Sequence, residues 1–190
     1  MPLLAAFQWF LQKPGFDGLD LGLADYNPSV LQLVTLPNLL LSWAQITQEG
    51  WEVEGELEIT PEMIQEFLQT LQSRQITLSF FSGAWSPEFV ELVSQTMTSK
   101  TSVLTIIGAE TIYSPAALKS FAETLLGLLD ALPDDNRTAL VAAKKVYFGV
   151  GGSMEDFCNL VRDKGRTVQQ IREESDGVRR ATVEVVNPAP

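Results

Sequence analysis

The chain has 190 residues, of which 45% are apolar, so it can form one domain with a substantial core but is too short for two comfortable ones. Thirteen basic and 24 acidic residues give a net charge of -11, which argues against nucleic acid as a direct ligand and favours a basic protein partner. A single cysteine and no histidine exclude a disulfide framework and multi-cysteine metal clusters, which indicates an intracellular protein without a metal site.

The apolar beginning of the chain, residues 1–11, lacks the positive charge and the cleavage site of a secretory signal. No run reaches the roughly 18 to 20 apolar residues that a membrane span requires. We therefore expect neither secretion nor insertion into a membrane.

The first half of the chain predicts two helices around a short strand, followed by an acidic segment. The predicted elements are a helix over 1–12, a strand over 19–24 and a helix over 28–45, in which Pro37 predicts a kink near Leu36. Seven glutamates and no basic residue lie between Glu49 and Glu66, which is typical of a solvated surface loop or hairpin. We expect an acidic insertion at about 48–60.

The second half predicts alternating helices and strands. The expected elements are helices over 61–74, 87–98, 115–132 and 154–164, strands over 76–81, 102–108 and 138–144, and extended segments over 167–173 and 178–186. Asp176-Gly177 between the last two segments indicates a hairpin, so the sheet should finish antiparallel.

Four helices should begin at a capping residue followed by proline. The pairs are Asn27-Pro28, Thr60-Pro61, Ser86-Pro87 and Ser114-Pro115. Three of them follow a strand-like run directly, which is the pattern of βα units in a parallel α/β sheet. We expect one domain over 1–187 and a short tail over 188–190.

The apolar run from Ser102 to Tyr113 predicts a central strand that is buried on both faces. It would deliver Glu110 and Tyr113 to the sheet rim, where open α/β sheets bind ligands. A carboxylate there can orient a nucleophilic nitrogen and an aromatic ring can flank a reactive methyl group, although Glu-x-x-Tyr is by itself a weak pattern.

Three other features allow a functional and a structural interpretation. Asp25, at the end of the first strand, can accept hydrogen bonds from ribose hydroxyls or can be an ordinary turn residue. Trp85 can stack on a planar base or cover the core. The run Gly149 to Gly152 comes too late for a dinucleotide fingerprint, so we interpret it as a flexible loop beside the site, with Lys145 unsuited as a base unless it is buried.

Four ordered motifs cover nearly the whole chain. They are Leu-Ala-Asp25-Tyr-Asn-Pro28, Phe80-Phe-Ser-Gly-Ala-Trp85-Ser86, Glu110-Thr-Ile-Tyr113 and Lys144-Lys-Val-Tyr-Phe-Gly-Val-Gly-Gly152. Together they resemble the protein-histidine N-methyltransferases in their fungal form. The resemblance implies a Rossmann-like, class I sheet of seven strands in the order 3-2-1-4-5-7-6.

The same resemblance implies the chemistry and its residues. S-adenosyl-L-methionine would be the methyl donor, held by Asp25 at the ribose, by the neighbouring Tyr26 and by Trp85 at the adenine, with Glu110 also at the cofactor. Glu110 and Tyr113 would flank the transfer to a histidine imidazole of a ribosomal large-subunit protein. The groove for that substrate would be lined by Tyr147, Phe148, Gly149, Gly151 and Gly152.

We also expect a monomer in the cytoplasm or nucleus, and the composition argues against nucleic acid, membrane and metal as ligands. The family's first strand and its Gly-rich cofactor loop have no counterpart in this sequence. We therefore expect a truncated domain in which cofactor binding and activity are impaired. Two other functions stay open: a non-catalytic interaction fragment or pseudoenzyme, and a lysine or small-molecule methyltransferase of the same fold.

Overall fold

The computed structural model describes residues 2–15, 18–48, 56–97, 103–131, 137–147, 151–174 and 179–187. Its contacts divide the chain into two compact units, Met1–Gly83 and Ala84–Pro190. Each unit holds its own sheet.

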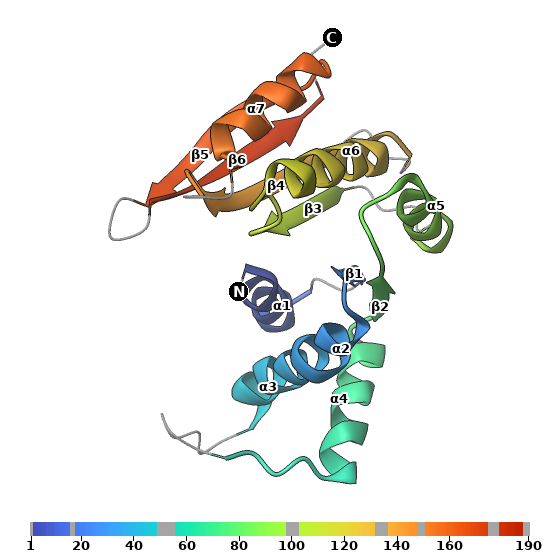
Figure 1. Cartoon of the computed structure of the whole chain (residues 1–190). Coiled ribbons are helices and arrows are strands. Elements are labelled where there is room, and N and C mark those ends of the chain that lie inside the picture. Colours follow the sequence, from blue (N-terminus) through green and yellow to red (C-terminus); the bar gives the residue numbers. More distant parts are fainter. Residues whose placement is uncertain are drawn as a thin grey trace. The chain divides into compact units, whose positions relative to one another are not determined.

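Unit 1 combines a two-stranded parallel sheet with helices (Figure 1). Its elements are α1 (Pro2–Gln12), β1 (Leu19–Asp25), α2 (Pro28–Val30), η1 (Leu31–Thr35), α3 (Leu36–Thr47), α4 (Pro61–Ser73) and β2 (Ile76–Ser82). β1 and β2 pair in register from Leu19 opposite Ile76 to Asp25 opposite Ser82. The core of this unit gathers apolar side chains from α1, β1, η1, α3 and α4: Phe7, Leu23, Leu31, Leu39, Leu40, Trp43, Ala44, Phe67 and Leu71.

The helical run from Pro28 to Thr47 contains a π-helical stretch, η1, just before Pro37. The N–H of Leu36 donates to the carbonyl of Leu31, five residues earlier, instead of four. Proline has no N–H for a helical hydrogen bond, so the predicted disturbance near Leu36 takes the form of a π-helical turn within a run that stays helical.

The same run corrects the expectation that nothing here is long and apolar enough for a membrane span. Pro28–Thr47 has 20 residues and a window of mean hydropathy 1.2, so it meets that requirement by length and composition. Polar residues such as Gln32 and Asn38 interrupt this helix, so it contains no unbroken apolar run. A core helix of a soluble protein passes the same test, and α3 buries Leu39, Leu40 and Trp43 in unit 1, so this is weak evidence for a span.

Unit 2 is built on a four-stranded sheet in the order β3-β4-β6-β5. Its elements are α5 (Pro87–Thr96), β3 (Leu104–Ala109), α6 (Pro115–Ala131), β4 (Arg137–Lys144), α7 (Met154–Asp163), β5 (Thr167–Glu174) and β6 (Arg180–Val186). β3 and β4 are parallel, whereas β6 runs antiparallel to both β4 and β5. The sheet therefore finishes antiparallel as predicted, while the turn expected at Asp176-Gly177 lies outside the described residues.

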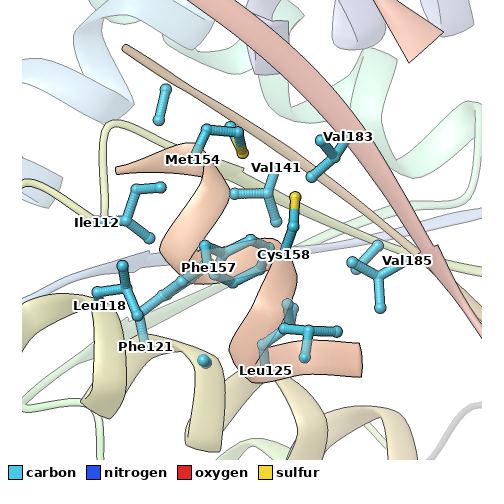
Figure 2. Packing of buried hydrophobic residues seen from close by; sticks show 14 of the residues in the cluster. Ile112, Leu118, Phe121, Leu125, Val141, Met154, Phe157, Cys158, Val183 and Val185 are labelled. Atoms are coloured by element: carbon cyan, nitrogen blue, oxygen red, sulfur yellow. The ribbon is translucent and has the colours of Figure 1, made fainter. Parts of the chain in front are cut away.

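Helices α6 and α7 cover one face of this sheet (Figure 1). The buried face carries alternating small and β-branched residues of β4 and β6: Ala139, Val141, Ala143, Ala181, Val183 and Val185. Figure 2 shows Phe157 of α7 between Phe121 of α6 and Val141 of the sheet. This packing holds the ends of β3, β4 and β6 in fixed relation, and those ends form the rim described below.

The predicted elements are confirmed to within a few residues, and all four proline-flanked caps form. In each cap the side-chain oxygen of the first residue accepts a backbone N–H two or three residues later. The donor and acceptor pairs are Ser29 to Asn27 (2.9 Å), Met63 to Thr60 (3.3 Å), Phe89 to Ser86 (3.3 Å) and Ala117 to Ser114 (3.2 Å). The order β2-β1 in one sheet matches strands 3-2 of the expected order 3-2-1-4-5-7-6. The order β3-β4-β6-β5 in the other sheet matches strands 4-5-7-6, so only strand 1 has no counterpart among the described strands. The α/β class is thereby confirmed.

The prediction that the strand after Ser102 is buried on both faces was wrong. β3 is an edge strand of its sheet, and its burial alternates, with Thr105, Ile107 and Ala109 exposed and Gly108 buried. One face packs on α6, where the Phe121 ring lies so close to Gly108 that an added Cβ would be 2.4 Å from its Cζ. An apolar run alone did not distinguish a central strand from an edge strand.

Candidate functional site

Glu110 lies at the carboxyl end of β3, on the rim of the unit 2 sheet. Its N–H donates to the carbonyl of Ala142 on β4 at 2.9 Å, so its backbone is fixed to the neighbouring strand. Its φ of 57° lies in the left-handed region, which costs a residue with a side chain about 1 to 3 kcal/mol. The fold therefore holds this carboxylate in a strained turn directly after a strand.

Both carboxylate oxygens of Glu110 are hydrogen-bonded. The Tyr147 hydroxyl donates to Oε2 at 2.8 Å, and the Arg180 Nε donates to Oε1 at 3.2 Å. Tyr147 follows β4 and Arg180 begins β6, so three elements converge on one carboxylate. Each oxygen retains acceptor capacity for one further N–H or O–H group.

The Tyr147 hydroxyl is a donor and remains protonated in this setting. Burial raises the pKa of Tyr147 to about 12, with the hydrogen bond to Glu110 as the second cause. The Lys144 ammonium lies 5.6 Å from the centre of the Tyr147 ring, within reach of a cation–π interaction. The phenol is thus unsuited as a base at neutral pH, which leaves Glu110 as the acceptor.

The glycines predicted to line the site lie against the segment that follows Glu110. Gly152 has φ +88°, and an added Cβ there would lie 2.9 Å from the Ile112 carbonyl oxygen. Gly151 has φ +72° and faces the Pro115 ring in the same way, at 3.1 Å. Val146 and Ser153 form an antiparallel bridge. Gly151 and Gly152 are therefore packed against a neighbouring segment, and Phe148 and Gly149 lie outside the described residues.

Tyr113 and Thr111 complete the segment after β3. Tyr113 is 56% exposed, with its ring available to a ligand. The Thr111 Oγ1 is buried and has no hydrogen-bond partner among the described residues, which costs on the order of 1 to 3 kcal/mol. Thr111 is a residue that the sequence argument did not single out, and its polar atom is one that a bound group could satisfy.

Trp85 is half-buried and packs on the unit 2 core. Its ring lies edge to face with Phe89 at 5.1 Å and with Phe121 at 5.9 Å between centroids. These contacts favour the interpretation that Trp85 covers the core, and they do not test whether its ring stacks on adenine.

Asp25 and Tyr26 belong to unit 1, at the carboxyl end of β1. Asp25 Oδ1 accepts the N–H of Asn27 at 2.8 Å, which is the turn role that the sequence allows. Its Oδ2 has no hydrogen-bond partner in the described part of the chain, so one oxygen is available to a ligand hydroxyl. Tyr26 is 73% exposed.

Arg180 is the residue of this rim that sequence reasoning missed. β6 is antiparallel, so its first residue lies beside the last residue of β4, with Lys144 opposite Arg180. The Arg179-Arg180 pair after a hairpin signal could have indicated positive charge at this rim, but no local pattern links Arg180 to a residue 70 positions earlier.

The neighbouring charges on the rim pair with one another. Glu173 at the end of β5 accepts from Lys145 at 3.0 Å and from Arg179 at 2.8 Å. Hydrogen bonds from Lys145, Arg179 and Gln170 lower the pKa of Glu173 to about 2. Arg179 thus forms an ion pair with Glu173, while the next residue, Arg180, forms an ion pair with Glu110.

The chain is similar to curated proteins from fungi and mammals. Histidine protein methyltransferase 1 of Saccharomyces cerevisiae is 39% identical over 161 residues, which cover 77% of this chain and 42% of that protein. The protein of the same name from Schizosaccharomyces pombe is 35% identical, covering 96% of this chain and 53% of the relative. The homolog from Rattus norvegicus is 35% identical, covering 87% and 43%. The chain spans about half the length of the curated relatives it matches.

No family model matches the chain. Among solved structures, magnesium protoporphyrin IX methyltransferase from Synechocystis, solved with bound SAM, aligns with a TM-score of 0.46 at 15% identity and covers 98% of this chain and 79% of that one. A TM-score this low carries no argument about function.

Proposed function

Because the chain is homologous, over most of its length, to about half of the histidine protein methyltransferases, we propose that it forms part of an S-adenosyl-L-methionine-dependent protein-histidine N-methyltransferase. In this proposal the rim of unit 2 receives the target imidazole, and Glu110 is the group that contacts it. Tyr113, exposed in the same segment, flanks the transferred methyl group.

The observation that carries the proposal is the arrangement around Glu110. A carboxylate in a strained, left-handed turn after β3 accepts hydrogen bonds from Tyr147 and Arg180 and has acceptor capacity left on both oxygens. A neutral imidazole has one N–H donor and one nitrogen with a lone pair. When Glu110 accepts the N–H of one ring nitrogen, it fixes the tautomer in which the other nitrogen is the nucleophile.

The chemistry is a transfer of a methyl group to nitrogen. S-adenosyl-L-methionine, when bound, supplies a methyl group on a sulfonium whose C–S electron pair returns to sulfur as the N–CH₃ bond forms. Positive charge develops on the imidazole in that step, and the Glu110 carboxylate stabilises it and accepts the N–H proton. The Tyr147 hydroxyl, with a pKa of about 12, stays a donor throughout.

Each unit offers one polar atom to a ligand. In unit 1, Asp25 Oδ2 is unbonded among the described residues at the end of β1, and at such strand ends α/β sheets bind ribose. In unit 2, the buried Thr111 Oγ1 lacks a hydrogen-bond partner among the described residues. Asp25, Tyr26, Trp85 and Glu110 are the residues that we propose to hold the cofactor, and Tyr147, Phe148, Gly149, Gly151 and Gly152 those that line the substrate groove.

In this proposal the methyl acceptor is a basic protein of the ribosomal large subunit. The chain acts on it as a monomer, in the cytoplasm or nucleus. The charge of the chain supports a basic acceptor, since the net charge is -11 and the segment from Pro14 to Ser73 contains ten acidic residues and no Lys or Arg.

The experiment measures methyl transfer from labelled S-adenosyl-L-methionine to ribosomal large-subunit proteins and locates the methyl group by mass spectrometry. The chain contains no histidine, so every methylhistidine found must lie on the acceptor. We expect transfer that disappears when the acceptor histidine is replaced by alanine and falls about 100-fold in Glu110→Gln. The matched control is Glu174→Gln, which removes a rim carboxylate that pairs with Arg172.

Two other results would overturn the proposal. Methylation of lysine would assign the chain to another acceptor class of the same fold. Absence of binding heat when S-adenosyl-L-methionine is titrated into the folded chain would leave the non-catalytic interaction fragment.

A further inference from the structure

Arg180 reaches Glu110 across the width of a strand. In the sheet order β3-β4-β6-β5, Glu110 follows β3 and Arg180 begins β6, with β4 between them. Arg180 can span this distance because β6 is antiparallel, which puts its first residue at the rim where β3 and β4 end.

The ion pair between Arg180 and Glu110 contributes little to stability. The side chains are 48% and 44% exposed, and exposed ion pairs are screened by water and by salt. Glu110 is also strained by its positive φ. A strained residue whose charge pair gives little stability is typical of a functional position.

We propose that Arg180 is a positioning residue, which holds the Glu110 carboxylate in the orientation that accepts the N–H of the target imidazole. This inference rests on the proposed function and deepens it. Arg180 fixes Oε1 and Tyr147 fixes Oε2, so the carboxylate plane is held at two points. Without Arg180 the side chain of Glu110 rotates about its own bonds, and its oxygens no longer point in a single direction.

The neighbouring residue provides a matched control. Arg179 carries the same charge on the same strand end but pairs with Glu173, at 2.8 Å. A general effect of positive charge on the rim would be equal for the two arginines. An effect of positioning is confined to Arg180.

The first measurement is methyl transfer at saturating and limiting S-adenosyl-L-methionine. In Arg180→Gln we expect kcat to fall about 10- to 100-fold with KM for the cofactor unchanged, because misplacement of a reacting group affects the chemical step. Arg180→Lys should recover part of the loss, and Arg179→Gln should stay within about twofold of the parent. In a Glu110→Gln background, Arg180→Gln should have no further effect. Equal losses in the two arginine variants, or no loss in either, would overturn the inference.

The second measurement needs no catalysis and separates failure of this inference from failure of the proposed function. The chain has three tyrosines, so Tyr26→Phe with Tyr113→Phe leaves Tyr147 as the sole phenol for ultraviolet titration. The positive charge of Arg180 lowers the pKa of Tyr147, whereas the hydrogen bond to Glu110 raises it.

In Arg180→Gln, loss of the Glu110 hydrogen bond and loss of the Arg180 charge would shift the pKa of Tyr147 in opposite directions. If Glu110 is released, the phenol loses its acceptor and its pKa falls from about 12. If Glu110 stays in place without Arg180, only the positive charge is lost and the pKa rises. A fall supports the inference, and a rise or no change overturns it, whether or not the parent chain transfers methyl groups.

Discussion

The Tyr147 hydroxyl and the Glu110 carboxylate, 37 residues apart in the chain, are joined by a hydrogen bond of 2.8 Å. This bond links the segment after β3 to the segment after β4. It also assigns their roles, since the phenol donates and the carboxylate accepts. Of these two groups, the carboxylate is therefore the one that can accept a hydrogen bond from an incoming ligand.

The first prediction concerns the alkaline stability of unit 2. The pKa of Tyr147 is raised to about 12 in the folded chain, above its usual value near 10, so the folded state holds this proton more tightly than the unfolded state. The resulting stabilisation is fully present below pH 10 and is lost as the pH rises to about 12. Tyr147→Phe should remove this part of the pH dependence in urea unfolding. Tyr113→Phe, which alters an exposed phenol, should retain it.

The second prediction concerns the close packing at Gly152. Gly152→Ala places a Cβ 2.9 Å from the Ile112 carbonyl oxygen, in addition to the strain of a positive φ. Gly165 has nearly the same φ, +84° against +88°, but nothing within 4 Å of an added Cβ. We expect Gly165→Ala to lower the free energy of unfolding by about 1 kcal/mol and Gly152→Ala by about 1 to 3 kcal/mol more. Equal losses in chemical denaturation would show that Gly152 is needed only for its backbone angle.

The third prediction concerns the contact between Gly108 and Phe121. Gly108→Ala would bring a Cβ to 2.4 Å from the Phe121 ring, which is itself buried among Trp85 and Phe157. We expect a loss of about 1 to 3 kcal/mol from overpacking. The double variant with Phe121→Leu should be more stable than the sum of the two single effects implies, because the smaller side chain makes room for the methyl group. Simple additivity in thermal or urea unfolding would contradict this account.

The fourth prediction concerns unit 1. Arg74 donates through Nη2 to the carbonyls of Phe10 at 2.9 Å and Lys13 at 2.8 Å, and so bonds carbonyls at the end of α1. Arg74→Ala should lower the free energy of unfolding by about 1.5 to 3 kcal/mol, as expected for charged hydrogen bonds that are partly buried. Arg172→Ala, which removes a guanidinium that is 71% exposed, should change it by less than about 0.5 kcal/mol.

Local chemistry made much of the fold predictable. Ser114 followed by Pro115 fixes the start of α6 from two residues alone, and the Ser114 hydroxyl does cap the helix at the Ala117 N–H. Local patterns could not show that β3 is an edge strand, because the coverage of Ile107 depends on neighbouring strands, whereas the missing counterpart of the family's first strand does predict an unpaired edge there. The apolar composition of β3 therefore overstated its burial.

The site was predictable to the extent that it lies on single strand ends. Glu110 was found because it follows an apolar strand, and Tyr147 because it leads into a glycine-rich run. Their hydrogen bond, and the approach of Arg180 from an antiparallel strand, arise from strand order and register, which bring together residues distant in sequence. The roles of Tyr113, Trp85 and Asp25 toward ligands stay predictions.

The π-helical turn at Leu31–Thr35 changes the phase of the helix that follows it. At 100° per residue, Leu39 and Trp43 would lie about 80° and 120° away from Leu31 in an uninterrupted α-helix. With one residue taken up by the wider turn, both come to within about 20° of Leu31, and all three are buried in the core of unit 1. The irregular turn before Pro37 thus aligns two short apolar stripes into one, and deleting a single residue there would leave a regular α-helix in which Leu39 and Trp43 keep the same alignment with Leu31.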